Sequence, residues 1–579
     1  MEINKQLPKP LIFLICLIQG IVLTYLYKSI ELELWPGNDL IWLHAIATFC
    51  ISFPILTLFV ITKDNLLAAV KYLLPFSLLL AALGAYTGLQ LEPKDIVQDW
   101  NASFVFSLTV LIASFKALMY IQHYINKELV KKEHGNNDKI KITFSSLFRL
   151  SWRNFIVFCE CYLFVIIFWG ILFLGAQLFT VIGINFFEEL LTKDWFVIPV
   201  LNLALGFAIV VFRSIGNTAD TISSILQTLI KFLLPVLTFV SVGFICTLPF
   251  TGLYSLWQTG HGSFLVLWLV SLTLFFVNAV YKDEASQRPY HILLHRLIYT
   301  GVVALPIYSL IAGYGLWLRI EQYGLTVDRC WGVLIWFLLS CFSFSYLVSI
   351  IRRRDEWIVE AGKINVVMGK VVLTLMLLVN SPLLNFQSVA VQSQLARLES
   401  GEIKAKEIDY QYFANHLGRQ GYLALQELKT SHPEQAAEID RLYQRRLPSA
   451  ERAKSLEDFK QYVTFWPSED SFDKELIQHI YDRETDANWK NYRGNNYYFI
   501  AIDLNEDALP EMIVLTENNS HTSGAYWFKE EGKWTSRYAD VINPEHNQFI
   551  KELVESNQIS ATQPQWKDLK IGDLVIKIQ

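Results

Sequence analysis

Charged residues are scarce in this sequence of 579 residues, and the scarcity is concentrated in its first two thirds. Lys, Arg, Asp and Glu make up 18% of the chain, below the roughly 25% of an ordinary soluble domain, whereas 53% of the chain is hydrophobic. Almost all long apolar runs lie within residues 1–387, and residues 388–579 have the composition of a soluble domain. A wholly soluble protein is therefore excluded, and the net charge of −5 argues against nucleic-acid binding.

Cysteine is absent from residues 388–579, although the chain holds seven cysteines upstream. An exported domain formed by that segment is therefore stabilised by its core and not by disulfides. Catalytic signatures are also missing: there is no G-x-S-x-G, no Walker lysine loop, no H-E-x-x-H and no G-x-G-x-x-G after a strand. The sequence favours a protein that is not an enzyme. An enzyme that works through a pair of carboxylates stays open as an alternative, because only geometry would reveal such a pair.

Long apolar runs are abundant in the first part of the chain. A transmembrane helix needs about 20 mostly apolar residues. Such runs occupy residues 11–27, 40–61, 66–88, 102–121, 155–183, 196–212, 232–257, 264–281, 297–318, 331–351 and 366–386. We therefore predict an α-helical polytopic membrane bundle of about 11 transmembrane helices over residues 1–387, with the lipid bilayer as its surroundings. A C-terminal soluble α+β domain follows over residues 388–579.

The distribution of Lys and Arg predicts the orientation of this bundle. If the N-terminus is cytoplasmic, the inner segments hold 19 of these residues and the outer loops hold five. The eleventh span then places residues 388–579 on the outer face, which is the periplasm for a bacterial inner membrane. No cofactor is predicted for the bundle itself.

The spacing of hydrophobic residues within 388–579 changes from a helical period to one typical of strands. Helical spacing covers 388–482, with segments at 407–429, 434–446, 455–464 and 471–482. Residues 496–579 contain β-structure: strands at 496–503 and 511–516, a β-hairpin at 525–537, a helix at 545–556 and a last strand at 573–578. The domain is thus predicted to begin with helices and to end with strands.

The stretch R-I-E-Q-Y-G-L-T-V-D-R, residues 319–329, concentrates charge between two apolar runs. Tyr323-Gly324 is a natural turn, because glycine accepts positive φ. Exposed ion pairs are worth only about 0–1 kcal/mol, so stability is a weak reason for so many charges. One hypothesis is a loop that docks the outer domain, through Gly418–Gly421 or the acidic helices, or binds a lipid head group. The alternative is a cap on two helices at head-group level. The candidate residues are Arg319, Glu321, Tyr323, Gly324, Asp328 and Arg329.

A second candidate is D-L-N-E-D-A-L-P-E, residues 503–511. Oxygen-bearing side chains at this spacing are the ligands that Ca²⁺ prefers, and the candidates are Asp503, Asn505, Asp507 and Glu511. The pattern is not an EF-hand, because Ala508 stands where the glycine belongs. The alternative is an acidic β-turn whose side chains bond their own backbone.

Three patterns together carry a family resemblance: R-I-x-Q-Y-G-L-T-x-x-R, then L-x-S-G, then H-L-G-R-Q-G-Y-x-A-L. With the preceding spans, they resemble a family of bacterial polytopic membrane proteins catalogued as domain of unknown function 4153. The matching residues are Arg319, Ile320, Gln322, Tyr323, Gly324, Leu325, Thr326, Arg329, Leu398, Ser400, Gly401, Leu417, Gly418, Arg419, Gly421, Tyr422, Ala424 and Leu425. The resemblance covers roughly residues 1–430. It implies location and architecture, and it lends no catalytic residue.

Three functions are compatible with these observations. The favoured one is an envelope sensor, recruiting or scaffold protein whose outer domain meets an envelope protein or a lipid. The second is a transporter or channel for a lipid-like or small neutral substrate, which a continuous polar cavity through the bundle would indicate. The third is a membrane-embedded envelope enzyme, which clustered carboxylate or His side chains at one membrane face would indicate.

Overall fold

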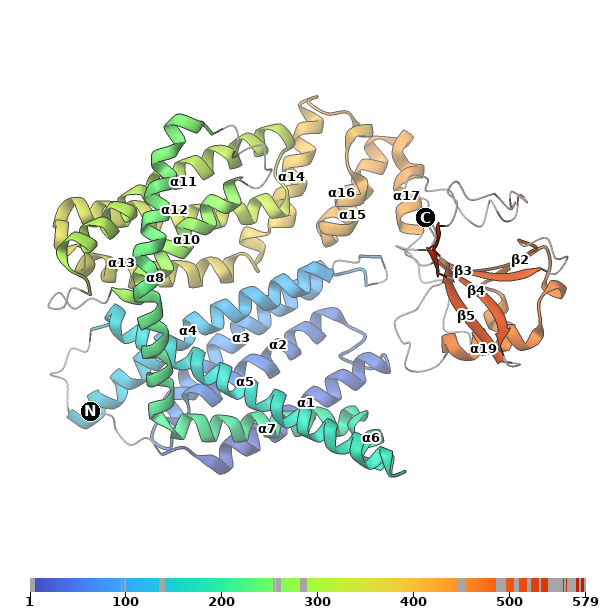
Figure 1. Ribbon diagram of the computed structural model, residues 1–579, viewed down its shortest axis with the longest axis horizontal. Coiled ribbons are helices and arrows are strands. Elements are labelled where there is room, and N and C mark those ends of the chain that lie inside the picture. The colour runs from blue at the N-terminus through green and yellow to red at the C-terminus, as the bar shows by residue number, and fades with distance from the viewer. Residues whose placement is uncertain are drawn as a thin grey trace. The chain divides into compact units, whose positions relative to one another are not determined.

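The computed structural model (Figure 1) describes residues 6–579 except 95, 98–99, 135–140, 254–255, 257–261, 282–288, 445–454, 486–495, 505–509, 518–521, 531–532, 540–553, 555, 557–558, 560–568, 572–573 and 577–579. The chain divides into two compact units, Met1–Ala436 and Ala437–Gln579. We call them unit one and unit two and describe each by itself.

Unit one holds ten segments, among the residues described, that are long and apolar enough to cross a membrane. They lie in α1 (Lys9–Glu31), α2 (Leu40–Val60), α3 (Leu66–Gln90), α4 (Trp100–His134), α5 (Phe144–Val181), α7 (Asp194–Ser214), α8 (Gly216–Thr251), α10 (Gly262–Val280), α11 (Ile292–Tyr323) and the stretch Val327–Leu378. That last stretch contains two helices, α12 (Val327–Arg353) and α13 (Trp357–Leu378), joined by the short 3₁₀ turn η1 (Arg354–Glu356). The eleven predicted apolar runs therefore fall on eleven helices, and the prediction of a polytopic bundle is confirmed.

The outer surface of these helices is apolar, as contact with lipid requires. Leu174 on α5 is 60% exposed, and Phe232 and Phe239 on α8 are 73% and 72% exposed. Soluble monomers rarely leave such continuous apolar surface in water. The chain is therefore a multi-pass membrane protein.

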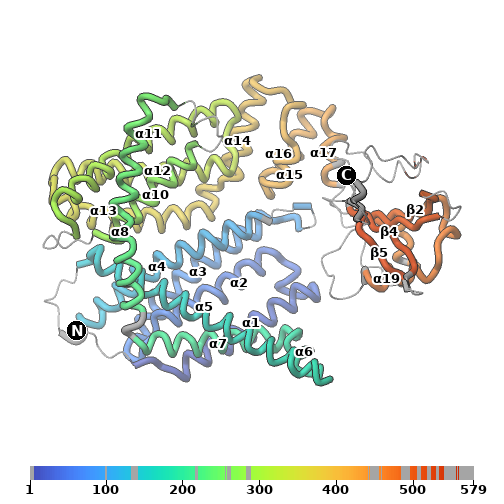
Figure 2. Tube along the Cα trace, viewed as in Figure 1, coloured from blue at the N-terminus to red at the C-terminus, as the bar shows by residue number. Residues whose placement is uncertain are grey.

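The helices of unit one form two groups that α8 connects (Figure 2). Buried side chains of α1, α2, α5 and α7 pack together, and a second core is formed by α8, α10, α11, α12 and α13. Helix α8 contacts α5 of the first group and α10 and α11 of the second. A short helix, α6 (Phe186–Leu191), lies between α5 and α7.

Three further helices belong to unit one: α14 (Phe386–Glu399), α15 (Tyr410–His416) and α16 (Gly418–Ser431), with 3₁₀ turns η2 (Pro382–Leu384), η3 (Ala405–Glu407) and η4 (Pro433–Gln435). Helix α14 contacts α12, and α16 contacts α3 and α14. The sequence assigned residues 388–436 to the outer domain, whereas their packing groups them with the membrane helices. The predicted helix at 407–429 is interrupted between α15 and α16 at Gly418, where φ is +50°.

Unit two is an α+β fold that begins at α17 (Ala436–Gln444), which starts on the last residue of unit one. It continues with α18 (Leu456–Lys460), β1 (Val463–Trp466), η5 (Glu469–Ser471), α19 (Lys474–Thr485), β2 (Asn496–Ile502), β3 (Glu511–Glu517), β4 (Thr522–Glu530) and β5 (Lys533–Ala539). The strands form one sheet in the order β1-β2-β3-β4-β5, and β6 (Leu569–Ile571) pairs with β7 (Leu574–Ile576). The predicted soluble α+β fold is confirmed.

The core of unit two lies between α19 and the sheet. Leu476 and Ile480 of α19 pack with Phe499 of β2 and Trp527 of β4. The predicted strands and hairpin correspond to β2, β3 and the pair β4–β5. The strand β1 was not predicted, and the helix expected at 455–464 ends at Lys460 because the following residues pair with β2 in parallel.

Two predicted elements near the C-terminus are described only in part. Of the helix expected at 545–556, only residues 554 and 556 are among those described, and of the strand expected at 573–578 only 574–576, which form β7.

Candidate functional site

The predicted loop at 319–329 is a three-residue connection between two helices. Helix α11 ends at Tyr323, and α12 begins at Val327. Gly324 has φ of +71°, which reverses the chain at the end of α11. The Thr326 side chain accepts a hydrogen bond from the Arg329 N–H and so caps the N-terminus of α12. We call residues 322–327 the α11–α12 turn.

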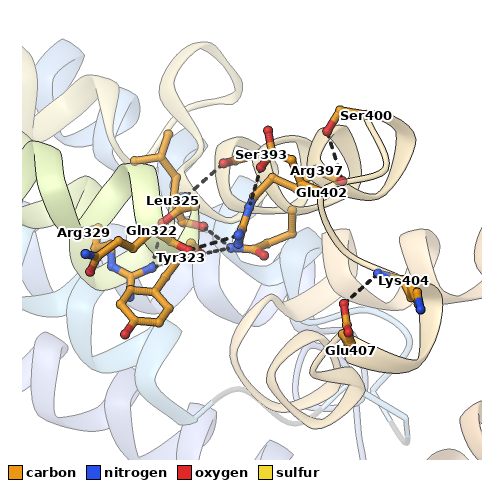
Figure 3. Close-up of polar contacts among 12 residues, drawn as sticks. Gln322, Tyr323, Leu325, Arg329, Ser393, Arg397, Ser400, Glu402, Lys404 and Glu407 are labelled. Atoms are coloured by element: carbon orange, nitrogen blue, oxygen red, sulfur yellow. Dashed lines mark hydrogen bonds and ion pairs between the residues drawn. The ribbon is translucent and has the colours of Figure 1, made fainter.

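Three side chains of α14 hydrogen-bond the main chain of this turn (Figure 3). The Leu325 N–H donates to Ser393 Oγ at 2.9 Å, and Gln394 Nε2 donates to the carbonyls of Tyr323 and Leu325, both at 3.0 Å. Arg397 Nη2 donates to the Gln322 carbonyl at 3.0 Å. The last carbonyls of a helix have no partner within that helix, so α14 satisfies groups that α11 leaves open.

Arg397 is itself held in place by a neighbour. Its Nε lies 3.2 Å from Glu402 Oε2, in the segment that follows α14. The carboxylate therefore orients the guanidinium group that binds the turn, and this pair belongs to the same network in Figure 3.

Helix α15 adds a fourth side chain from the other end of the turn. The Val327 N–H donates to Tyr412 Oη at 2.9 Å. Burial raises the pKa of Tyr412 above the ordinary value for tyrosine, so the hydroxyl stays protonated and neutral at physiological pH. The turn is thus held by α14 at its α11 end and by α15 at its α12 end.

Of the six residues predicted for this loop, three lie together. Arg329 Nη1 donates to the carbonyls of Gly324 at 2.6 Å and Tyr323 at 3.3 Å, and its guanidinium lies over the Tyr323 ring at 5.4 Å. The side chains of Arg319, Glu321 and Asp328 are exposed. Within the described part of the chain, neither Arg319 with Glu321 nor Asp328 with Arg329 forms an ion pair.

The residues that hold the turn are not identified by the sequence pattern. Ser393, Gln394 and Arg397 follow the last membrane span, and their spacing places them on one face of a helix. That spacing is the available signal, but it does not show what the face contacts. The helical spacing around Tyr412 likewise indicates no partner for its hydroxyl.

A second set of contacts joins α16 and the N-cap residue of α14 to α3. Gln420 Nε2 donates to Gln90 Oε1 at 2.9 Å, and Asn385 Nδ2 donates to Tyr86 Oη at 2.7 Å. A Cβ on Gly418 would lie 3.0 Å from the Gln90 carbonyl oxygen, so glycine allows this approach. The start of α16 therefore lies against the end of α3, while α14 and Tyr412 hold the α11–α12 turn. We call the segment 385–431 the collar.

The predicted Ca²⁺ ligands lie only partly within the described residues. Asn505 and Asp507 are outside them, whereas Asp503 and Glu511 are described. Glu511 Oε2 accepts a hydrogen bond from the Leu504 N–H at 2.6 Å. The Ca²⁺ site stays a prediction. Elsewhere in the described chain, no group of three or more His, Cys, Asp or Glu side chains could hold a metal ion.

The fold defines a multi-pass helical membrane protein that carries a C-terminal α+β unit. The family model described as a domain of unknown function, DUF4153, matches residues 38–428. This match spans more than half of the chain, so the protein belongs to that family, as the resemblance indicated. The matched range includes the α11–α12 turn and ends within α16, before unit two. No curated protein and no solved structure matches the chain.

Proposed function

We propose that this is a bacterial inner-membrane protein whose unit two lies in the periplasm and recruits an envelope partner. The collar couples that unit to the membrane bundle. The observation that carries the proposal is the set of hydrogen bonds from Ser393, Gln394, Arg397 and Tyr412 to the α11–α12 turn. A scaffold or sensor needs such a junction, because events in its outer part must be passed to its membrane part.

The chemistry of the junction supports a stiff connection. The five bonds described above, from α14 and Tyr412 to the turn, end on main-chain atoms. A change in the relative position of α11 and α12 therefore displaces the hydrogen-bond partners of α14 and α15. Hydrogen bonds in a partly buried network reinforce one another. The chain then continues from the collar through α17 into unit two.

The charge distribution supports the orientation. With a cytoplasmic N-terminus, Lys and Arg are concentrated in the inner segments, and eleven helices bring the collar to the outer side. Unit two then follows the collar on the same side.

The proposal is tested by affinity purification of the full-length protein in mild detergent, with mass spectrometry of the proteins and lipids that are retained. The coupling variant is Gln394→Ala/Arg397→Ala, which removes three of the bonds to the turn. The control is Arg319→Ala, because that side chain is exposed beside the same turn.

We expect a protein partner that is retained by the native chain and by Arg319→Ala and is reduced severalfold with the coupling variant. Equal retention in all three preparations would refute coupling through the collar. Retention of no protein partner by the native chain would refute recruitment itself.

A further inference from the structure

A polar cavity lies in unit one among the ends of α1, α2, α4, α5, α7 and α8. Its volume is about 1210 Å³. Five cationic side chains and one carboxylate line it: Lys9, Lys63, Arg149, Arg153, Arg213 and Asp220. The predicted orientation places this end of the bundle at the cytoplasmic face, opposite the end that carries the α11–α12 turn.

Some of the polar groups in the cavity are used by the fold. Arg213 donates to the carbonyls of Leu58 and Ile61, where α2 ends. Gln122 and Asn154 exchange amide hydrogen bonds of 3.2 and 2.9 Å between α4 and α5. These bonds hold the helices around the cavity in place. They do not involve the other hydrogen-bond donors that line it.

Several donors have no use in the fold. Among the described residues, Lys9, Arg149 and Arg153 make no ion pair and no hydrogen bond through their side chains. Thr62 is also a lining residue, but it is 2% exposed and its buried hydroxyl is not accessible from the cavity. Lys9 and Arg149 are exposed and Arg153 is half-buried, so these three cationic side chains are available to an anion in the cavity.

We propose that the cavity binds a phosphate group, carried by the head group of an anionic lipid or by a soluble phosphate ester. The planar guanidinium groups of Arg149 and Arg153 match phosphate oxygens in a bidentate manner. They lie four residues apart on α5, so both project from one face of that helix. Basic pockets between membrane helices at the cytoplasmic side are suited to lipid head groups.

The same turns of α5 favour the lipid as the carrier of the phosphate. The rings of Phe144, Phe148, Trp152 and Phe155 contact one another in succession, with centroids 5.7, 5.9 and 6.5 Å apart. Aromatic side chains are enriched at the level of the head groups. The apolar row and the two arginines thus share one helix end, which suits a ligand with acyl chains and an anionic head.

The test is calorimetric titration of the full-length protein in detergent with three probes. Dihexanoyl phosphatidylglycerol carries an anionic head group on acyl chains, glycerol 3-phosphate is a soluble phosphate ester, and dihexanoyl phosphatidylcholine is zwitterionic. We expect phosphatidylglycerol to bind more tightly than phosphatidylcholine. If glycerol 3-phosphate binds as tightly as phosphatidylglycerol, the phosphate site stands and its ligand is soluble. If the two lipids bind equally and glycerol 3-phosphate does not bind, the proposal is overturned.

Paired variants assign the binding to the cavity. Arg149→Gln/Arg153→Gln should weaken binding of the anionic probe about 25-fold, because the loss of each cation near a head group weakens binding about fivefold. Arg352→Gln/Arg353→Gln removes two arginines from the end of α12, outside the cavity, and should leave binding unchanged. Equal losses in the two double variants would contradict the assignment.

A variant that is expected to gain affinity separates loss of the binding site from loss of folding. Asp220 is the carboxylate in the lining and repels an anion. Asp220→Asn should therefore tighten binding of the anionic probe severalfold. Unchanged or weaker binding by this variant would overturn the proposal even if the arginine variant cannot be purified.

Discussion

Arg319 and Arg329 lie ten residues apart and differ in what they contact. Arg329, in the first turn of α12, reaches back to the carbonyls of Gly324 and Tyr323, whereas the Arg319 side chain is exposed. The sequence predicted a charged turn at Gly324 but could not distinguish the two arginines. Their difference depends on the exact residues at which α11 and α12 end, and helix ends are set by caps and contacts that the hydrophobic pattern does not contain.

Gly324 gives the residue-scale prediction. A Cβ at this position would lie 2.8 Å from Gln394 Nε2 and 3.0 Å from Arg397 Cδ, in addition to the strain of φ +71°. Gly401 has φ of +78° and nothing within 4 Å of such a Cβ. Alanine at a left-handed position such as Gly401 costs about 1–2 kcal/mol of backbone strain. Gly324, with ψ of −179°, lies in a region that is essentially restricted to glycine, where the strain is about 1–3 kcal/mol. Gly324→Ala should cost about 1 kcal/mol more, because moving Gln394 breaks hydrogen bonds to the turn.

The measurement is thermal unfolding of the full-length protein in detergent. The expected order of stability is native, then Gly401→Ala, then Gly324→Ala. Equal losses for the two variants would show that contact with α14 adds nothing to the turn.

At the scale of elements, what could be predicted depended on length and on local pairing. The long apolar helices of unit one were predictable because a membrane span needs about 20 apolar residues, and the β4–β5 hairpin because its strands are adjacent in sequence. The strand β1 was missed because it has four residues and pairs in parallel with β2, some thirty residues further along. The role of α14 was missed for a similar reason: its partners, in the α11–α12 turn, precede it by about seventy residues.

Unit two gives the element-scale prediction, which concerns pH. Lys529 of β4 lies 2.8 Å from Asp473, just before α19, and this hydrogen bond lowers the pKa of the Asp473 carboxyl below its ordinary value of 3.8. The bond between Asp473 and the Glu475 N–H acts in the same direction. The stabilisation is therefore present above pH 3.8 and is lost as the pH falls through the lowered pKa.

Asp473→Asn tests this dependence in the full-length protein. Its thermal midpoint for unit two should lie slightly below that of the native chain at pH 7, and the difference should vanish on acid titration. Asp470→Asn, which changes an exposed carboxylate nearby, should match the native chain throughout. A deficit for Asp473→Asn that is the same at every pH would contradict the assignment.

At the scale of the whole molecule, the sequence predicts an orientation but not a cavity. The imbalance of Lys and Arg between alternate loops needs only the order of the spans. The basic cavity of unit one is different, because its lining comes from six helices and the segments before and between them, from Gln6 to Asp220. In the sequence, the basic residues indicate only the topology of the spans, and their convergence in space indicates a further use.

The claim on which the remaining proposals depend is the orientation. It places the collar and unit two outside and the basic cavity inside. Tyr538, on β5 of unit two, is 67% exposed, and Arg352 is exposed at the opposite end of α12 from the turn. Single cysteines at these positions can be labelled with a membrane-impermeant maleimide in intact and permeabilised spheroplasts. The native chain serves as the control for its seven cysteines.

The account predicts that Tyr538→Cys is labelled in intact spheroplasts and Arg352→Cys only after permeabilisation. The reverse pattern, or labelling of both positions from the same side, would contradict it.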